Sequence, residues 1–184
     1  MFWWLWLIIA VVALIIILLI YYFNKIVVLS NRIDNAFSQI NVQLKKRNDL
    51  IPNLVATVKG YAKHEKGIFE ELAKARAEMT KAGSLDAKFK ASDMLSNALK
   101  SIFAIAENYP ILKANENFKE LQQELSDIES KIAYTRQFFN DSILFYNNTV
   151  TTFPGTIFAG IFGKQKKDYL QITQAERQNV KVEF

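Results

Sequence analysis

Cysteine is absent from this chain of 184 residues, and histidine occurs once, at His64. The lack of cysteine excludes disulfides, thiolate metal ligands and cysteine nucleophiles. A single histidine also excludes the paired histidines of a zinc-protease helix and the two Glu-x-x-His motifs of a di-iron bundle. We therefore expect no metal site and no cofactor, and we interpret His64 as a solvated residue at the rim of the fold.

Proline and glycine are scarce, with three and six copies respectively. This composition favours long helices over a turn-rich β fold. The sequence also contains neither a glycine-rich phosphate loop nor a serine nucleophile elbow that could work with the histidine. We expect a helical protein that is not an enzyme.

Charged residues are absent from the first 24 positions. The uncharged run from Phe2 to Phe23 would extend about 33 Å as a helix, against about 30 Å for the hydrocarbon core of a bilayer. Tryptophans crowd its first turns, and Tyr21 and Tyr22 close it, as aromatic rings do at the two bilayer interfaces. A cleaved signal peptide would need a basic start and a shorter apolar run. We predict a transmembrane anchor over residues 1–24.

Basic residues follow this run and none precedes it: Lys25, Arg32, Lys45, Lys46 and Arg47. The positive-inside rule then predicts a single-pass protein of the cell membrane, with its N-terminus outside and the remainder in the cytoplasm. A net charge of +5 beside an anionic leaflet favours membrane lipids as a partner. Because the basic residues are scattered among acidic ones, we expect no nucleic acid partner.

Apolar residues recur at steps of three and four in four later segments, as is typical of amphipathic helices. The four stripes are Ile26, Leu29, Ile33, Phe37, Ile40, Leu44; Ile51, Leu54, Val58, Tyr61, Glu65, Ile68, Leu72, Ala75, Met79; Leu85, Phe89, Ser92, Leu95, Leu99, Ile102, Ala106; and Phe118, Leu121, Leu125, Ile128, Ile132, Thr135, Phe139, Ser142, Tyr146, Val150, Phe153. We predict an all-α fold in which the transmembrane helix is followed by an antiparallel (up-down-up-down) four-helix bundle over residues 25–153. Residues 154–184 form a C-terminal segment and tail.

Helix-end signals separate these segments. Gly83 and Ser84 fit a C-terminal glycine followed by an N-cap serine. Pro110 stops the third helix, Asn115 is a suitable N-cap for the fourth, and Pro154 ends the fourth.

Pro52 lies near the junction of the first two segments and allows two interpretations. Proline is tolerated in the first turn of a helix but costs about 3 kcal/mol in the interior. With Asp49 as N-cap, Pro52 falls in a first turn and Arg47–Asp49 form a corner. The alternative is one kinked helix from the membrane to Met79. We favour the corner because it yields four antiparallel neighbours with short loops.

The stretch RNDLIPNLVATVKGYAKHE from Arg47, the stretch LQQELSDIESKIAYTR from Leu121 and the run FFNDSILFYNNTV–FP–FG from Phe138 to Gly163 resemble the LemA family of bacterial membrane proteins. The motif RxDLIPNLV is specific to that family, and here it includes Arg47, Asp49, Pro52 and Asn53 as a structural motif. The resemblance implies an antiparallel four-helix bundle on a membrane anchor, without an established enzymatic activity. Family members often end in a tail that contains proline, whereas this chain ends in QNVKVEF.

Glu65 occupies an inward step of the second stripe, where a carboxylate must be paired, neutral or hydrated. Arg136, beside the inward Thr135 of the fourth helix, is the partner that we predict. The pair would fix the register of two helices. The alternative is a polar core that senses a ligand.

The segment after Pro154 combines an apolar cluster with a basic edge: Ile157, Phe158, Ile161, Phe162, Lys164, Lys166 and Lys167. The predicted topology returns this segment to the membrane, where interfacial segments have this composition. Two alternatives stay open, since the cluster could contact the bilayer or cap the base of the bundle.

These features favour a non-enzymatic scaffold or interaction module at the inner face of the bacterial cell membrane. The expected partners are membrane lipids, other membrane proteins or further copies of the chain. The alternative function is a signal-input module, in which a small ligand in the polar core around Glu65 alters helix packing.

Overall fold

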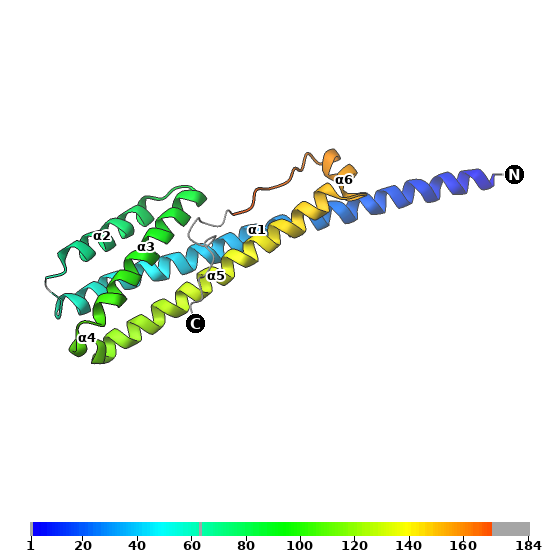
Figure 1. Ribbon diagram of the computed structural model, residues 1–184. Coiled ribbons are helices and arrows are strands. Elements are labelled where there is room, and N and C mark those ends of the chain that lie inside the picture. The colour runs from blue at the N-terminus through cyan, green and yellow to red at the C-terminus, as the bar shows by residue number, and fades with distance from the viewer. Residues whose placement is uncertain (1, 63, 171–184) are drawn as a thin grey trace, which may run out of the picture. The chain divides into compact units, whose positions relative to one another are not determined.

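The computed structural model describes residues 2–62 and 64–170, and the regular secondary structure of these residues is entirely helical (Figure 1). The helices are α1 Trp3–Lys59, α2 Lys66–Lys81, α3 Leu85–Ala106, α4 Pro110–Ala114, α5 Glu116–Thr151 and α6 Gly155–Ile161. The predicted all-α class is confirmed. The tail sequence QNVKVEF lies outside the described residues. The chain divides into two compact units. One contains the described residues 2–37 and 136–170, and the other, the unit of residues 38–135, is described except for residue 63.

The first part of α1 exposes its apolar side chains. Trp3 and Trp6 are 74% and 73% exposed, and most large hydrophobic side chains up to Phe23 are exposed as well. Of the described helices, only α1 is long and apolar enough to cross a membrane, judged by length and composition. A contiguous apolar surface of this kind is unfavourable in water and is the surface that a transmembrane anchor requires.

The prediction of a corner at Arg47–Asp49 is wrong, because α1 continues through Pro52 as far as Lys59. An interior proline removes a helical hydrogen bond and costs about 3 kcal/mol. The ring of Pro52 is exposed, whereas three neighbouring side chains on α1 are fully buried: Ile51, Leu54 and Val58. Each of these burials contributes about 1.5–3 kcal/mol, so packing outweighs the cost of the proline.

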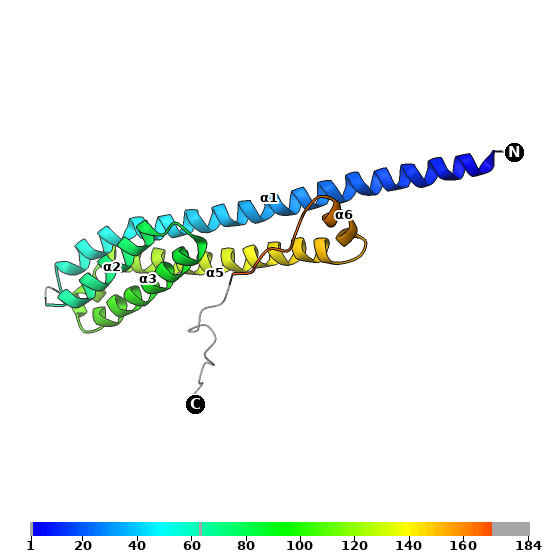
Figure 2. The ribbon, with the colours of Figure 1, turned by 90° about the horizontal axis from the view of Figure 1, so that it is seen from above.

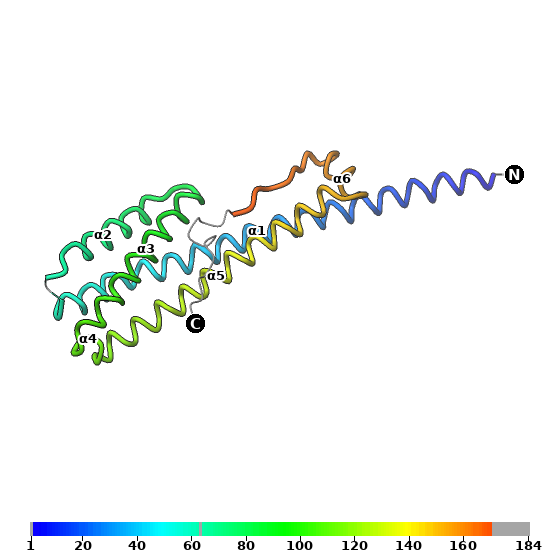
Figure 3. Tube along the Cα trace, viewed as in Figure 1, coloured from blue at the N-terminus to red at the C-terminus, as the bar shows by residue number. Residues whose placement is uncertain are grey.

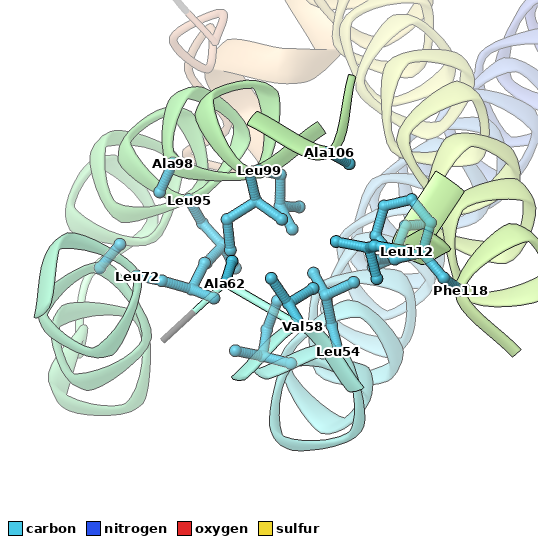
Figure 4. Close-up of a cluster of buried hydrophobic side chains, with 14 residues drawn as sticks. Leu54, Val58, Ala62, Leu72, Leu95, Ala98, Leu99, Ala106, Leu112 and Phe118 are labelled. Carbon is cyan, nitrogen blue, oxygen red and sulfur yellow. The ribbon is translucent and has the colours of Figure 1, made fainter. Parts of the chain in front are cut away.

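The unit of residues 38–135 has one hydrophobic core, built from side chains of α1, α2, α3, α4 and α5 (Figure 4). In both ribbon views α2 and α3 lie side by side (Figures 1 and 2). The buried residues of the core are Ile51, Leu54, Val58, Ala62, Leu72, Ala75, Leu95, Ala98, Leu99, Ile102, Ala106, Leu112, Phe118 and Leu125. Most of them belong to the predicted stripes, which therefore mark the buried helix faces. Tyr61 is an exception at 39% exposed, because it follows the end of α1.

Two predicted N-caps are confirmed in this unit. The Ser84 hydroxyl accepts a hydrogen bond from the amide of Ala87 at 3.2 Å, and the Asn115 side-chain oxygen accepts one from the amide of Phe118 at 2.9 Å. Each satisfies an amide that the first turn of a helix leaves without a partner.

In the unit of residues 2–37 and 136–170, the last turns of α5 bury Phe139, Ile143, Tyr146 and Val150. The helix ends at Thr151, and Phe153 is 81% exposed, so the last step predicted for the fourth stripe is wrong. The chain then forms α6 beside α1 and continues as an extended segment (Figures 2 and 3).

Candidate functional site

The helix α6 packs aromatic side chains against α1 where the uncharged run ends. The ring of Phe158 stacks on that of Tyr22, with centroids 4.8 Å apart and an interplanar angle of 11°. The ring of Phe162 meets that of Phe23 nearly edge-on at 5.2 Å. Such aromatic pairs contribute about 0.5–1.5 kcal/mol beyond the burial of their area. The end of the apolar run is therefore also the docking site of α6.

The opposite face of α6 is apolar and exposed. Ile157 and Ile161, one helical turn apart, are 54% and 63% exposed, whereas Phe158 is 8% exposed. The sequence left open whether this cluster contacts the bilayer or packs on the helices. The two phenylalanines pack on α1, and the two isoleucines form the part of the cluster that remains available to a bilayer.

Glycines define both ends of α6. A Cβ atom at Gly155 would lie 2.0 Å from the carbonyl oxygen of Thr149, so a larger residue does not fit where α6 approaches the end of α5. Gly163 has a φ of 62°, and the amide of Lys164 donates to the carbonyl of Ala159 at 2.9 Å. This is the Schellman pattern, in which glycine adopts the left-handed conformation. It turns the chain out of α6 into residues 164–170, which we call the strap.

Two asparagines of α5 hold the backbone of the strap. The side chain of Asn147 accepts from the amide of Lys167 and donates to its carbonyl, both at 2.8 Å. Asn140 repeats this pattern with Leu170, at 2.9 Å and 3.3 Å respectively. The asparagines are seven helical residues apart, a rise of about 10.5 Å, and the bound residues are three extended residues apart, about 10 Å. The matching rise lets both amides bind at once.

The three lysines of the predicted basic edge also divide into exposed and attached side chains. Lys164 and Lys166 are exposed, whereas the Lys167 ammonium donates to the Ser30 hydroxyl at 3.2 Å and lies 5.2 Å from the ring centroid of Tyr146. Burial raises the pKa of the Tyr146 hydroxyl above its usual value. Lys167 therefore attaches the strap to α1 and α5, and only two of the three predicted lysines face outward.

A groove of about 350 Å³ lies between α1 and α5 in the same unit. Its lining residues are Tyr22, Lys25, Leu29 and Arg32 of α1 and Phe145, Asn148, Thr149 and Thr152 of α5. Two of these side chains are basic and none is acidic. The sequence showed Lys25 and Arg32 only as orientation signals, because the α5 side of the groove comes much later in the chain.

Arg47, which we predicted at a corner, is fully buried within the unit of residues 38–135. Its guanidinium donates to the Ser92 hydroxyl at 2.6 Å, to the Ser92 carbonyl at 3.1 Å and to the Ser96 hydroxyl at 2.9 Å. It also forms an ion pair with the carboxylate of Glu129. Burying an arginine is unfavourable unless its charge is paired and its donors are satisfied. These contacts pair the charge and satisfy both terminal nitrogens of the guanidinium, whereas its Nε has no hydrogen-bond partner among the described residues. Arg47 thus joins α1 to α3 and α5.

The remaining predicted motif residues lie on the exposed face of α1: Asp49, Pro52 and Asn53. Asp49 pairs with Lys45 at 2.8 Å, one helical turn away, but exposed pairs of this kind contribute little to stability. Arg47 is the member of the motif that organises the interior.

Glu65 does not lie inside a helix, contrary to the prediction, because the chain leaves the helical conformation between α1 and α2. It is the residue before α2, is half-buried, and accepts a hydrogen bond from the Tyr109 hydroxyl at 3.2 Å. Its pairing with Arg136 stays a prediction, since the two residues belong to different units. The neighbouring His64 is exposed, as predicted.

The helical architecture and the exposed apolar run define a membrane-associated, all-helical protein. The LemA family model matches residues 36–184, more than half of the sequence, and the chain therefore belongs to the LemA family. The resemblance drawn from the motifs is confirmed.

Similar proteins include three magnetosome proteins. The magnetosome proteins MamQ 1 and MamQ 2 of Paramagnetospirillum magneticum are each 27% identical over 174 residues, which cover 80% of this chain and 64% of the relative. The magnetosome protein MamQ of Magnetospirillum gryphiswaldense is 27% identical over 158 residues, which cover 72% of this chain and 58% of the relative. The chain thus spans less than two thirds of the length of these relatives.

Proposed function

We propose that this chain is a non-enzymatic scaffold of the cell membrane, anchored by the first part of α1 in a single pass. In this proposal its helical remainder lies in the cytoplasm as an antiparallel four-helix bundle. Its partners are membrane lipids and either other membrane proteins or further copies of the chain. The similarity to MamQ, a magnetosome protein, supports a role at a membrane.

The observation that carries this proposal is that α6 packs one face against α1 and leaves an apolar face exposed. Phe158 and Phe162 attach the helix to Tyr22 and Phe23, where the uncharged run ends, and Ile157 and Ile161 stay exposed. If the run crosses the bilayer, α6 is held at the level of the headgroups. An apolar face followed by exposed lysines is the composition of interfacial segments that bind anionic lipid surfaces. We infer that α6 lies in the membrane interface.

The bundle arrangement is supported by the hydrophobic core that the helices of residues 38–135 share. Side chains from α1, α2, α3 and α5 meet in that core, and the connections between these helices are short. The ligand-sensing alternative lacks such support, because Glu65 precedes α2 and already accepts a hydrogen bond from Tyr109.

The interfacial position of α6 can be tested with one label, since the chain has no cysteine. The full-length variant Ile161→Cys, carrying a polarity-sensitive fluorophore, is placed in nanodiscs that contain lipids brominated near the headgroup. We expect blue-shifted emission and quenching. The control variant is Ile111→Cys on α4, which is 73% exposed in the wild-type chain and belongs to the other unit. Equal quenching of both labels, or of neither, would reject the contact.

The scaffold role requires a bound protein. Crosslinking of the full chain in intact cells, followed by mass spectrometry, should recover either a stoichiometric membrane protein or defined multimers of the chain. Recovery of the monomer alone would reject the scaffold and leave only the membrane contact.

A further inference from the structure

The groove between α1 and α5 is lined by basic and polar side chains. Its two cations, Lys25 and Arg32, stand seven residues apart on α1. This separation is close to two helical turns, so both side chains lie on one face, about 10.5 Å apart along the axis. Leu29 lies between them. The lining therefore has two positive ends around an apolar centre.

Neither cation is neutralised within the part of the chain that the structure describes. Lys25 and Arg32 are exposed and form no ion pair there, whereas Arg47 on the same helix pairs with Glu129. The Lys25 ammonium instead lies 5.7 Å and 6.0 Å from the ring centroids of Tyr21 and Tyr22. Contact with an aromatic ring attracts a cation without cancelling its charge. The groove is thus a site of positive potential.

Arg32 is positioned by aromatic rings from α5. Its guanidinium carbon lies 4.9 Å from the ring centroid of Phe138 and 5.5 Å from that of Phe145. These contacts restrict the side chain, and none of the hydrogen bonds among the described residues uses its donors. A guanidinium with available N–H groups binds the oxygens of a phosphate in a bidentate manner. The chemistry of the groove therefore suits a phosphate.

The α5 side of the groove adds groups that recognise hydroxyls. The hydroxyls of Thr149 and Thr152 donate to the carbonyls of Phe145 and Asn148, so their oxygen atoms remain as acceptors. Asn148 adds an exposed side-chain amide. A ligand that combines a phosphate with free hydroxyl groups would satisfy both sides of the groove.

The position of the groove on α1 identifies the source of such a ligand. Lys25 is two residues beyond Phe23, the last residue of the uncharged run, and so only about 3 Å further along the helix axis. We propose that the groove binds the headgroup of an anionic phospholipid, with its phosphate between Lys25 and Arg32 and its hydroxyls on the threonines of α5. This assignment rests on the membrane anchoring that we propose above.

Native mass spectrometry of the full chain, released from mixed micelles of phosphatidylglycerol and phosphatidylcholine, tests the assignment. We expect one phosphatidylglycerol to be retained in preference to phosphatidylcholine. The double variant Lys25→Gln/Arg32→Gln should lower the apparent affinity on the order of thirtyfold, as expected for two basic residues at an anionic surface. The matched control Lys90→Gln/Lys100→Gln removes two exposed charges from α3 and should retain the lipid.

Three results would overturn the assignment. Equal loss in both double variants would show attraction by net charge alone, and equal retention of both lipids would show no headgroup recognition. Displacement by soluble glycerol phosphate at the concentration of the lipid would assign the groove to a free phosphate. Sedimentation with vesicles separates this test from the anchor: a chain that sediments with vesicles but shows no lipid preference refutes only the groove, and a chain that does not sediment refutes the anchor as well.

Discussion

Two arginines on α1 have opposite environments, although both follow the same apolar run. Arg47 is fully buried and binds Ser92, Ser96 and Glu129. Arg32 is exposed, rests on two phenylalanine rings and has no carboxylate partner among the described residues. A charge that is neutralised inside a protein is needed for the fold, whereas a positioned charge without a counterion is available to a ligand. Substitution of the two residues should therefore have different consequences.

Arg47→Ala should have the largest effect on stability. It removes the guanidinium N–H groups that donate to Ser92, Ser96 and Glu129. The buried acceptors then lack a partner, which costs about 3–5 kcal/mol. Glu129 is partly hydrated, with 37% of its side chain exposed, so we expect the lower end of this range. The thermal midpoint of the full chain in detergent, followed by circular dichroism, should fall by roughly 10 °C.

Arg32→Ala is the matched control for this measurement. Arg32 is exposed and its replacement leaves no buried group unpaired, so the loss should be limited to its contacts with two aromatic rings, about 0.5–1 kcal/mol. Similar losses in the two variants would remove the distinction between the structural and the available arginine.

Pro52→Ala tests whether one continuous helix carries both arginines. In the interior of α1, alanine restores an amide that can donate to the carbonyl of Asn48, and the gain outweighs the greater freedom of the unfolded chain. We expect a gain of about 1–2 kcal/mol in the free energy of unfolding, measured with urea in mild detergent. If Pro52 began a helix, its replacement would give no gain. Asn53→Ala, at the next exposed position, controls for helix propensity.

Local sequence patterns predicted much of the fold. The three-four spacing of apolar residues marked the buried faces, and Ser84 and Asn115 were recognised as N-caps because a cap depends on the three residues that follow it. Pro52 was misplaced because it, too, was judged from its neighbours in the chain alone. A local rule assigns proline to a first turn, whereas the burial of Ile51, Leu54 and Val58 against other helices maintains the helix through it.

The polar sites depend on contacts that local patterns do not contain. Arg47 was identified only as a motif residue, since its partners lie on α3 and α5. Asn140 and Asn147 were not recognised as strap contacts either, although their spacing of seven residues on an otherwise apolar helix face was a usable signal. Polar amides at such positions need partners, and a backbone segment is a suitable one.

Asn147→Ala should release the strap with little effect on the helices. The variant loses two hydrogen bonds to Lys167, one of which leaves a backbone amide without a partner. We expect trypsin to cleave after Lys166 or Lys167 roughly tenfold faster than in the wild-type chain, because cleavage requires local opening. Asn148→Ala is the control, since that neighbouring side chain is exposed and no hydrogen bond among the described residues joins it to the strap. Equal cleavage rates in the two variants would show that the asparagine does not hold the strap.

The smallest expected effect is spectroscopic and concerns Glu65. Burial, and then the hydrogen bond and negative charge of Glu65, raise the pKa of Tyr109 above its usual value. A raised folded-state pKa stabilises the protein below the unfolded pKa of about 10, and this contribution is lost as the pH rises through the folded pKa. Glu65→Gln should lower the pKa of Tyr109, so that its absorbance near 295 nm rises at a lower pH than in the wild-type chain. Subtraction of the Tyr109→Phe titration isolates this tyrosine, and an unchanged midpoint would mean that the carboxylate does not interact with it in solution.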